Sequence, residues 1–369
     1  MIGVKTFDNA DARSNREAAE KLLAWYDVHA RDLPWRVGPW DRRAGEAQDP
    51  YRVWLSEIML QQTTVATVKS YYEKFVRLWP TVQDLAAAPL DDVLTAWAGL
   101  GYYARARNLH KCAVIVANER QGIFPDSEEG LLKLPGIGPY TAAAIAAIAY
   151  DVPSTVVDGN VERVISRLYN IHEKIPDSRP ILREKAESLT PRERSGDYAQ
   201  AIMDLGATIC TPRKLHCGDC PWQQFCQGRA AGTALELPKK KSKADLATRR
   251  GFVFWVEVDG RLWLRKRPEQ GLLGGMMEIP SSNWVECAHW QERGEPRVPI
   301  IANWTVLPGI VRHTFTHFHL ELKVMRGALE EIINLQEGEW VPLTELQNYP
   351  LPTVMKKVID MVRAPMLDL

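Results

Sequence analysis

Four cysteines lie close together in the 369-residue chain: Cys210, Cys217, Cys220 and Cys226, with the spacing C-x6-C-x2-C-x5-C. Four thiolates can bind either a structural zinc ion or an iron–sulfur cluster. Structural zinc usually has two C-x2-C pairs, and this run contains only one. Free cysteines would act as small apolar side chains, which four residues at these spacings disfavour. The compact run in one loop (210–226) therefore favours a [4Fe–4S] cluster, whose four irons need four thiolates around a single centre.

Two carboxylates could carry out acid–base chemistry. Glu57 is the one acid in the apolar stretch 53–63, and burial there would raise its pKa. Asp158 precedes the helical segment 161–168 and is a natural N-cap, a position that favours an ionised carboxylate. A protonated acid and an ionised one together can cleave a glycosidic bond, because one protonates the leaving group and the other stabilises the cationic sugar. Each residue also has a structural alternative, Glu57 on a solvated face and Asp158 as a helix cap alone.

The run LPGIGPYT (134–141) lies between two helical segments. Gly136 and Gly138 have no Cβ, so a DNA backbone could approach closely, and the N-terminus of the following helix would offer N–H groups to a phosphate. An ordinary helix–helix turn would look similar. Together with the cysteine loop about seventy residues later, the run favours a hairpin that binds DNA.

Two tyrosines are followed closely by two arginines in the segment 101–107, GYYARAR. An aromatic side chain such as Tyr102 could be inserted between bases while the arginines hold flanking phosphates. The alternative is a pair of core aromatics with solvated arginines.

The periodicity of apolar residues predicts two domains of different class. Residues 16–227 show apolar side chains three and four apart, separated by Pro and Gly, so we expect an all-helical domain over 1–232. A basic linker is expected at 233–250. Beyond it, two β-rich runs flank Asp259-Gly260, a further strand is expected from His317, and a helix is expected over 353–362. The second domain, 251–369, is therefore predicted to be α+β.

The composition is that of a globular protein, with 46% hydrophobic and 25% charged residues and a net charge of zero. The chain has no run of eighteen apolar residues and no apolar signal segment near its start, so we expect a cytoplasmic protein without a membrane span. A net charge of zero is still compatible with DNA binding through a local basic patch.

Several segments resemble one family. The cysteine spacing resembles the cluster loop of the helix-hairpin-helix DNA glycosylases related to endonuclease III. The runs WLSEIMLQQT, GLGYYARARNLH, LPGIGPYT, VDGNVERV and AQAIMDLGATICT resemble the MutY family of adenine DNA glycosylases, and with the second domain the resemblance covers essentially the whole chain. That family removes adenine mispaired with 8-oxoguanine or guanine. The resemblance implies an all-α helix-hairpin-helix glycosylase domain with an iron–sulfur loop, followed by an α+β Nudix-like domain.

The resemblance also implies roles for individual residues. Glu57 matches the acid that protonates adenine, Asp158 matches the carboxylate that stabilises the cation, and Asn160 and Tyr140 match supporting polar residues. Relatives with lyase activity have a lysine at position 140, which forms a Schiff base, so tyrosine implies a monofunctional enzyme. The other matched positions are Gln200, near the bound adenine, Gln62 and Tyr102, inserted beside 8-oxoguanine, and Arg36, Gly136 and Gly138, among the residues that contact substrate or DNA.

The second domain adds to the resemblance. Residues 271–280 resemble the start of a Nudix-like fold, but the glutamate-rich magnesium helix of Nudix hydrolases is absent from the sequence, so hydrolysis by this domain is not expected. Phe315, Thr316 and His317 match the F-S-H loop of the family's 8-oxoguanine-recognition domain, with threonine in place of serine. A second departure from the family is the longer stretch 37–48.

Two other functions would fit part of the pattern. One is a thymine- or uracil-mismatch glycosylase of the same fold, and the other is a binding protein that marks lesions without catalysis. An iron–sulfur electron carrier is disfavoured because it needs neither the hairpin nor a Nudix-like domain. The expected partner is double-stranded DNA containing adenine opposite 8-oxoguanine or guanine, bound by a monomer that associates with the nucleoid through DNA.

Overall fold

The computed structural model describes residues 9–240, 246–268, 271–315, 317–334 and 337–364. Its contacts divide the chain into two compact units, each described here by itself. Unit 1 comprises Met1–Ala87 and Asn108–Ser242, and unit 2 comprises Ala88–Arg107 and Lys243–Leu369. The domain boundaries after residues 232 and 250 stay a prediction.

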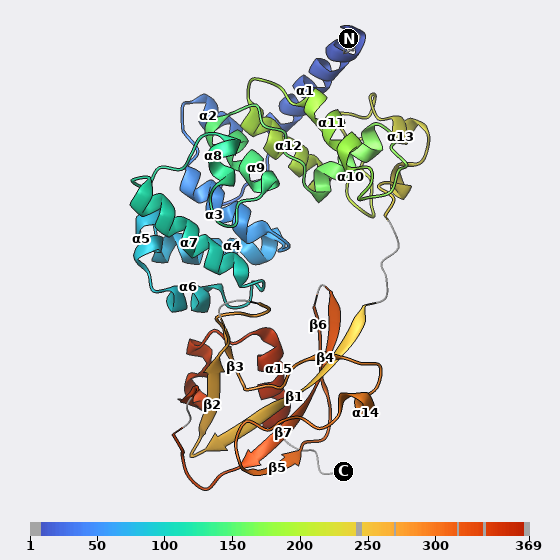
Figure 1. The fold of residues 1–369 in the computed structure, drawn as a ribbon. Coiled ribbons are helices and arrows are strands. Elements are labelled where there is room, and N and C mark those ends of the chain that lie inside the picture. Colours follow the sequence, from blue (N-terminus) through green and yellow to red (C-terminus); the bar gives the residue numbers. More distant parts are fainter. Residues whose placement is uncertain (1–8, 241–245, 269–270, 316, 335–336, 365–369) are drawn as a thin grey trace, which may run out of the picture. The chain divides into compact units, whose positions relative to one another are not determined.

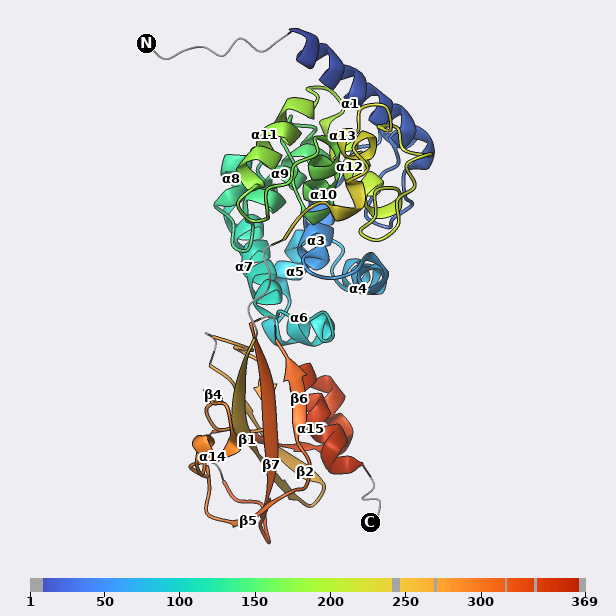
Figure 2. The same ribbon diagram turned by 90° about the vertical axis from the view of Figure 1, so that its right-hand side faces the viewer.

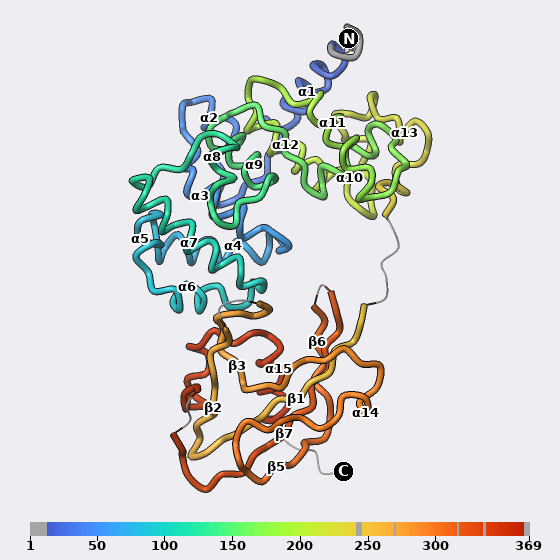
Figure 3. The backbone as a smooth tube through the Cα atoms, in the orientation of Figure 1, coloured from blue at the N-terminus to red at the C-terminus, as the bar shows by residue number. Residues whose placement is uncertain are grey.

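The named elements of unit 1 in its described residues are helices joined by loops, as the apolar periodicity predicts (Figures 1 and 3). Its helices are α1 (Asn9–His29), α2 (Pro39–Arg43), α3 (Pro50–Leu60), α4 (Val65–Leu78), α5 (Val82–Ala87), α7 (Ala104–Glu119, from residue 108), α8 (Glu128–Leu132), α9 (Pro139–Tyr150), α10 (Gly159–Leu168), α11 (Arg179–Leu189), α12 (Ser195–Thr208), α13 (Gln227–Ala230) and the 3-10 helix η1 (Ala234–Glu236).

Helix α9 lies at the centre of unit 1. Its sequence, PYTAAAIAAIAY, is buried over Thr141–Ile148 because small side chains let neighbouring helices approach closely. It contacts α3, α8 and α12, and α12 in turn contacts α10. Helix α3 begins at Pro50, where the Asp49 side chain caps the backbone N–H of Tyr51. These contacts bring α3, α9, α10 and α12 together although their sequences are far apart.

The turn between α8 and α9 has the glycine geometry that a close approach requires. Gly136 has φ +78°, and a Cβ built there would lie 2.8 Å from the Cβ of Asn108, so a side chain at this position would be both strained and blocked. Gly138 is the N-cap of α9 and has an extended backbone. A Cβ at Gly138 would meet nothing within 4 Å, so the backbone here is accessible.

The longer stretch 37–48 contains α2, which is held to unit 1 by ion pairs. Arg43 pairs with Asp27 of α1, and Arg42 lies 3.5 Å from Asp197 of α12. Gln48 is buried and donates to the carbonyl of Val37 at 3.3 Å, which closes the stretch on itself. The stretch therefore forms an ordered, packed element.

Unit 2 combines strands with a few helices. Its elements are α6 (Leu90–Trp97), the start of α7, β1 (Ala247–Val258), β2 (Arg261–Lys266), β3 (Met277–Glu278), β4 (Val285–Glu286), α14 (Trp290–Arg293), β5 (Asn303–Val306), β6 (Val311–Thr314), β7 (Phe318–Ala328), β8 (Glu339–Pro342), the 3-10 helix η2 (Leu343–Asn348) and α15 (Thr353–Arg363).

The strands of unit 2 form a mixed sheet, and Figure 2 shows the long strands β1 and β7 side by side. The strands follow the order β3-β2-β1-β7-β5, β4 also pairs with β1, β6 with β7 and β8 with β2. Among the strands of the described residues, β1 and β7 are the pair that runs in parallel, so this pair needs a long connection.

The predicted elements of the second half are confirmed. Strands β1 and β2 form an antiparallel pair around Asp259-Gly260, β7 begins at Phe318, and α15 begins at Thr353. Strand β1 begins at Ala247, inside the segment that the charge pattern assigns to the linker, because Ala247 is already paired with Phe318 of β7. In the part of the chain that the structure describes, no helix is long and apolar enough to cross a membrane.

Candidate active site

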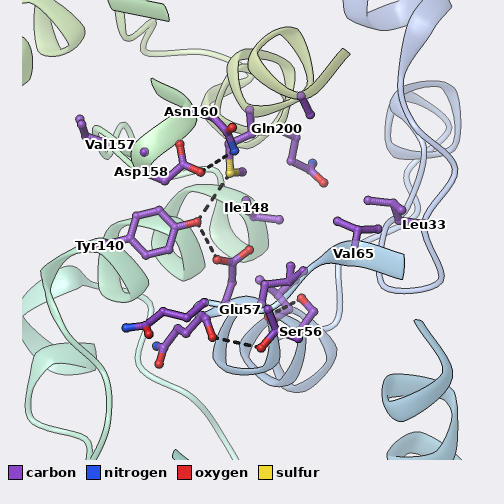
Figure 4. A pocket seen from close by; sticks show the side chains of 18 of the residues that line it. Leu33, Ser56, Glu57, Val65, Tyr140, Ile148, Val157, Asp158, Asn160 and Gln200 are labelled. Carbon is purple, nitrogen blue, oxygen red and sulfur yellow. Dashed lines mark hydrogen bonds between the residues drawn. The ribbon is translucent and has the colours of Figure 1, made fainter. Parts of the chain in front are cut away.

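A cavity of about 1090 Å³ lies within unit 1, where α3, α9, α10 and α12 meet the segment between α1 and α2. Its wall combines apolar side chains, such as Leu33, Val65 and Ile148, with a smaller set of polar groups (Figure 4). The cavity brings together seven of the residues singled out from the sequence: Arg36, Glu57, Gln62, Tyr140, Asp158, Asn160 and Gln200.

Glu57 and Tyr140 form the hydrogen-bonded centre of this cavity. Glu57 is on α3 and is only 5% exposed, and Tyr140 is in the first turn of α9. The Tyr140 hydroxyl donates to Oε2 of Glu57 at 3.0 Å and lies 3.6 Å from the sulfur of Met203 (Figure 4). The contact between α3 and α9 therefore fixes the orientation of the Glu57 carboxyl group.

Asp158 enters the cavity from the N-terminus of α10. One carboxylate oxygen accepts from the backbone N–H of Val161 at 2.7 Å, and the other accepts from Nδ2 of Asn160 at 2.9 Å. Two donors and the positive end of the helix dipole both favour a negative charge at this position. The capping role and a role in chemistry are thus compatible in one side chain.

The surroundings of Glu57 bring its pKa close to neutral pH. Its pKa is raised from 4.5 to about 7, chiefly because the side chain is buried. Asp158 also raises the pKa, whereas the hydrogen bond from Tyr140 and the charge of Arg36 lower it. Burial also raises the pKa of Tyr140 well above its usual value of 10, with Glu57 and Asp158 adding to the effect. The tyrosine hydroxyl consequently keeps its proton, while Glu57 can change protonation state.

The four cysteines of the loop line a second, smaller cavity together with Arg167 and Arg229. Arg167 Nη1 donates to the Cys210 sulfur at 3.3 Å, and the backbone N–H of Arg229 donates to the Cys226 sulfur at 3.4 Å. Among the residues that the structure describes, no three His, Cys, Asp or Glu side chains converge as ligands of one metal ion. In a four-iron cube each thiolate binds its own iron, so cysteines that surround a shared space fit a cluster better than a single ion.

The cysteine loop also contacts the residues around Asp158. Arg163, on α10, donates from Nε to the carbonyl of Cys210 at 2.9 Å and from Nη2 to Oδ1 of Asn160 at 2.9 Å. Asn160 in turn donates to Asp158. Hydrogen bonds therefore connect the first cysteine of the loop with the carboxylate in the active-site cavity.

Some predicted residues lie outside this cavity. Tyr102 is 49% exposed, and its φ of +50° is a conformation that tyrosine rarely adopts. Gln62, which does line the cavity, has φ +57°. Such strain is common at functional sites.

Phe315 and His317, two of the candidate recognition residues, lie between the paired strands β6 and β7 of unit 2. His317 is exposed, whereas Phe315 packs between His313 and Phe318, with ring centroids 4.7 and 4.8 Å away. The backbone N–H of Phe315 donates to the carbonyl of Phe318 at 2.9 Å and closes the turn. Thr316 lies outside the described residues.

Comparisons with known proteins agree with this two-part organisation. The model of the HhH-GPD superfamily of base excision DNA repair proteins matches residues 55–192, and the NUDIX domain model matches residues 252–361. An adenine DNA glycosylase from Homo sapiens is 36% identical and covers 91% of this chain and 72% of its own length. One from Buchnera aphidicola (Schizaphis graminum) is 30% identical and covers 94% of this chain and 98% of its own. The chain belongs to the adenine DNA glycosylase family.

Family membership confirms the predicted fold class and the prediction of a DNA glycosylase. Among solved structures, a thermostable thymine-DNA glycosylase superimposes with a TM-score of 0.52 and 29% identity, over 60% of this chain and all of its own. It thus resembles part of this chain, whereas the adenine DNA glycosylase from Homo sapiens matches 91% of it.

Two residues of the cavity region were missed by the reasoning from sequence. Arg31 lines the cavity, and Asp204 lies behind it and is fully buried. Asp204 carries the same signal as Glu57, an acid within the apolar run AIMDLGA of a helix. Because a buried acid needs a charged partner, this signal could have identified Asp204 as part of an ion pair, although not its partners.

Proposed function

We propose that this chain hydrolyses the N-glycosidic bond of adenine paired with 8-oxoguanine or guanine in double-stranded DNA. The observation that carries the proposal is the presence, in one cavity, of a buried glutamate with a pKa of about 7 and a hydrogen-bonded aspartate at a helix N-terminus. The names of the family's members add adenine as the base. The adenine nucleotide has to leave the base stack to reach this cavity.

In the proposed reaction, Glu57 donates its proton to a ring nitrogen of adenine while the bond between the base and C1′ of the sugar breaks. The electron pair of that bond leaves with the base, which the added proton turns into a neutral leaving group. A buried acid with a pKa of about 7 is well matched to proton transfer at neutral pH. Tyr140 holds the carboxyl group in place through its hydrogen bond.

Loss of adenine leaves positive charge on the sugar, and we assign its stabilisation to Asp158. Asn160 orients this carboxylate and does not neutralise it, since the amide only donates a hydrogen bond. Water then adds to C1′ and gives up a proton, which leaves an abasic site. Gln200, fully buried on α12 and lining the same cavity, is proposed to contact the bound adenine.

The residue at position 140 makes the proposed enzyme monofunctional. Strand cleavage by a Schiff-base mechanism requires a free amine in the cavity. Tyr140 has none, and the hydroxyl is already hydrogen-bonded to Glu57. We therefore expect base release without strand cleavage.

DNA contacts and the cofactor complete the proposal. Gly136 and Gly138 would let the phosphate backbone approach the hairpin before α9, Arg36 would contact the substrate, and Gln62 and Tyr102 would be inserted beside the lesion. The four loop cysteines would hold a [4Fe–4S] cluster with a structural role, which shapes the loop at 210–226.

In unit 2 we propose that the tip of the β6–β7 hairpin recognises 8-oxoguanine. His317 is exposed there and can donate or accept a hydrogen bond, whereas the packed ring of Phe315 anchors the turn. Thr316 is included on the strength of the sequence resemblance alone. The chain is proposed to act as a monomer.

The decisive experiment is a single-turnover assay on a duplex with adenine opposite 8-oxoguanine. We expect release of free adenine and a strand that breaks only after alkali or heat. Glu57→Gln, nearly identical in shape, should bind the duplex but lose at least about a hundredfold in rate, because general acids contribute roughly 10²–10⁴.

Other outcomes would contradict the proposal. Release of thymine or uracil from mismatches, with adenine retained, would make the chain a glycosylase of different specificity. Tight binding without any base release would make it a lesion-binding protein. A borohydride-trapped protein–DNA adduct in the wild type would contradict the monofunctional assignment.

A further inference from the structure

Asp204 is a buried carboxylate that holds two arginines of the cavity wall. Oδ1 accepts from Nε of Arg31 at 2.7 Å, and Oδ2 accepts from Nη1 of Arg36 at 2.8 Å and from the backbone N–H of Arg31 at 3.0 Å. The Asp204 side chain is 0% exposed and that of Arg36 is 8% exposed. Both arginines line the cavity that contains Glu57, whereas Asp204 is behind its wall.

The local sequence explains how one carboxylate reaches both arginines. Residues 31–36 leave α1 and form a turn in which the backbone N–H of Arg36 donates to the carbonyl of Leu33 at 2.9 Å. Asp204 lies on α12, which packs against α1. One buried negative charge therefore faces two positive charges. The two guanidinium groups together carry one more charge than Asp204 balances, and both line the cavity that contains Glu57.

Arg36 has two carboxylates within electrostatic reach. Burial lowers its pKa, but attraction to Asp204, then to the hydroxyl of Tyr26, and then to Glu57 outweighs burial and leaves the pKa raised. Arg36 also acts on Glu57 in the reverse sense, since its positive charge favours the ionised glutamate. Of its two carboxylate partners, Asp204 is the hydrogen-bonded one.

We propose that Asp204 is a positioning residue for glycosidic-bond hydrolysis: by holding Arg36, it keeps this guanidinium from pairing with Glu57, and Glu57 remains available as the proton donor. This inference rests on the role proposed above for Glu57. An ion pair between Arg36 and Glu57 would keep the glutamate ionised at neutral pH, and an ionised glutamate has no proton to give.

The groups around Glu57 and Arg36 determine the sign of the expected effect. Tyr140 from α9, Asp158 from the start of α10 and Arg36 act on Glu57. Around Arg36 lie Tyr26 from α1 and Asp204 from α12. When the charge of Asp204 is removed, Glu57 is the one carboxylate left in this set that attracts Arg36, so its protonated form is disfavoured.

The test is Asp204→Asn, which preserves shape but removes the charge. Single-turnover release of adenine opposite 8-oxoguanine is measured from about pH 5 to about pH 9 for variant and wild type. We expect the midpoint of the basic limb to fall by about one pH unit or more, so that the rate above the midpoint falls about tenfold, while the rate at the acidic end changes little. Asp204→Glu, which keeps the charge, should have a midpoint close to that of the wild type.

Two further variants separate positioning from stability. Asp197→Asn removes another buried carboxylate of α12, which pairs with Arg42 and Arg194 instead, and should leave the midpoint unchanged. Arg36→Gln should move the midpoint upward, opposite to Asp204→Asn, because the positive charge beside Glu57 is gone. A structural defect would not move the midpoint in opposite directions for the two partners of one ion pair.

Each outcome decides the inference. A lower rate for Asp204→Asn at every pH with an unchanged midpoint overturns it. A midpoint shift in Asp197→Asn as large as that in Asp204→Asn also overturns it. If Asp204→Asn does not fold, Arg31→Gln/Asp204→Asn removes one positive charge as well and is compared with Arg31→Gln. A lower midpoint in the double variant supports the inference and an equal one overturns it. If wild type releases no adenine, the proposed function fails instead.

Discussion

Removing the hydroxyl group of Tyr140 should move the pH dependence of base release upward. Tyr140→Phe keeps the ring that packs at the start of α9 and deletes the donor that lies 3.0 Å from Glu57. That hydrogen bond lowers the pKa of Glu57 against the larger effect of burial, and the resulting pKa is about 7. Without the donor the ionised glutamate is less stable, so Glu57 should stay protonated to higher pH.

The size of the shift follows from the energy of the hydrogen bond. A hydrogen bond to a charged group contributes about 1.5–3 kcal/mol, and one pKa unit corresponds to about 1.4 kcal/mol. The 5% exposure of Glu57 means that water can replace little of the lost bond. The midpoint of the basic limb should therefore rise by about one to two pH units.

The assay is single-turnover release of adenine opposite 8-oxoguanine across the pH range, with enzyme in excess. Tyr198→Phe is the matched control, since Tyr198 is a buried tyrosine of α12 whose hydroxyl has no hydrogen-bond partner among the described residues. Its midpoint should equal that of the wild type. An unchanged or lower midpoint in Tyr140→Phe would show that Glu57 does not govern the basic limb, or that its hydrogen bond to Tyr140 is not formed.

Three other perturbations test separate parts of the molecule. Because the pKa of Glu57 is raised from 4.5 to about 7, the wild type is fully stabilised below pH 4.5 and loses this stability as the pH rises to about 7. Glutamine cannot ionise, so Glu57→Gln should raise the free energy of unfolding above pH 7 by about 3 kcal/mol, measured in urea. Anaerobically purified protein should be brown and contain about four irons per chain, and one zinc without iron would refute the cluster. His317→Ala should retain base release but reduce the preference for 8-oxoguanine over guanine by about tenfold to a hundredfold in titrations of both mispairs, and full retained preference would refute recognition by unit 2.

Much of the fold could be predicted from local patterns. Apolar periodicity distinguishes the helices of unit 1 from the strands of unit 2, and Asp259-Gly260 identifies the hairpin between β1 and β2. These features depend on neighbouring residues, so the sequence contains them directly. The parallel pairing of β1 with β7 could not be predicted this way, because Ala247 and Phe318 are separated by a long connection that carries no register signal.

The candidate site was predictable to a similar extent. Glu57 and Asp158 have local signals, an acid among apolar residues and a helix cap, and both line the cavity. The contact between Arg36 and Asp204 has none, since 168 residues separate the two and the apolar surroundings of Asp204 do not indicate its partner. Only the packing of α12 against α1 brings them together.

The protonation of Glu57 shows why a motif alone does not determine chemistry. Burial and Asp158 raise its pKa, Tyr140 and Arg36 lower it, and these three residues come from three separate segments of the chain. The sum of these effects decides whether the glutamate holds a proton at neutral pH, and Asp204 holds one of these residues, Arg36, without lining the cavity itself. A chain with the Glu57 motif intact could therefore still lack a usable acid if its packing released Arg36. The competence of this acid is a property of the assembled helices, and the motif supplies only the group that titrates.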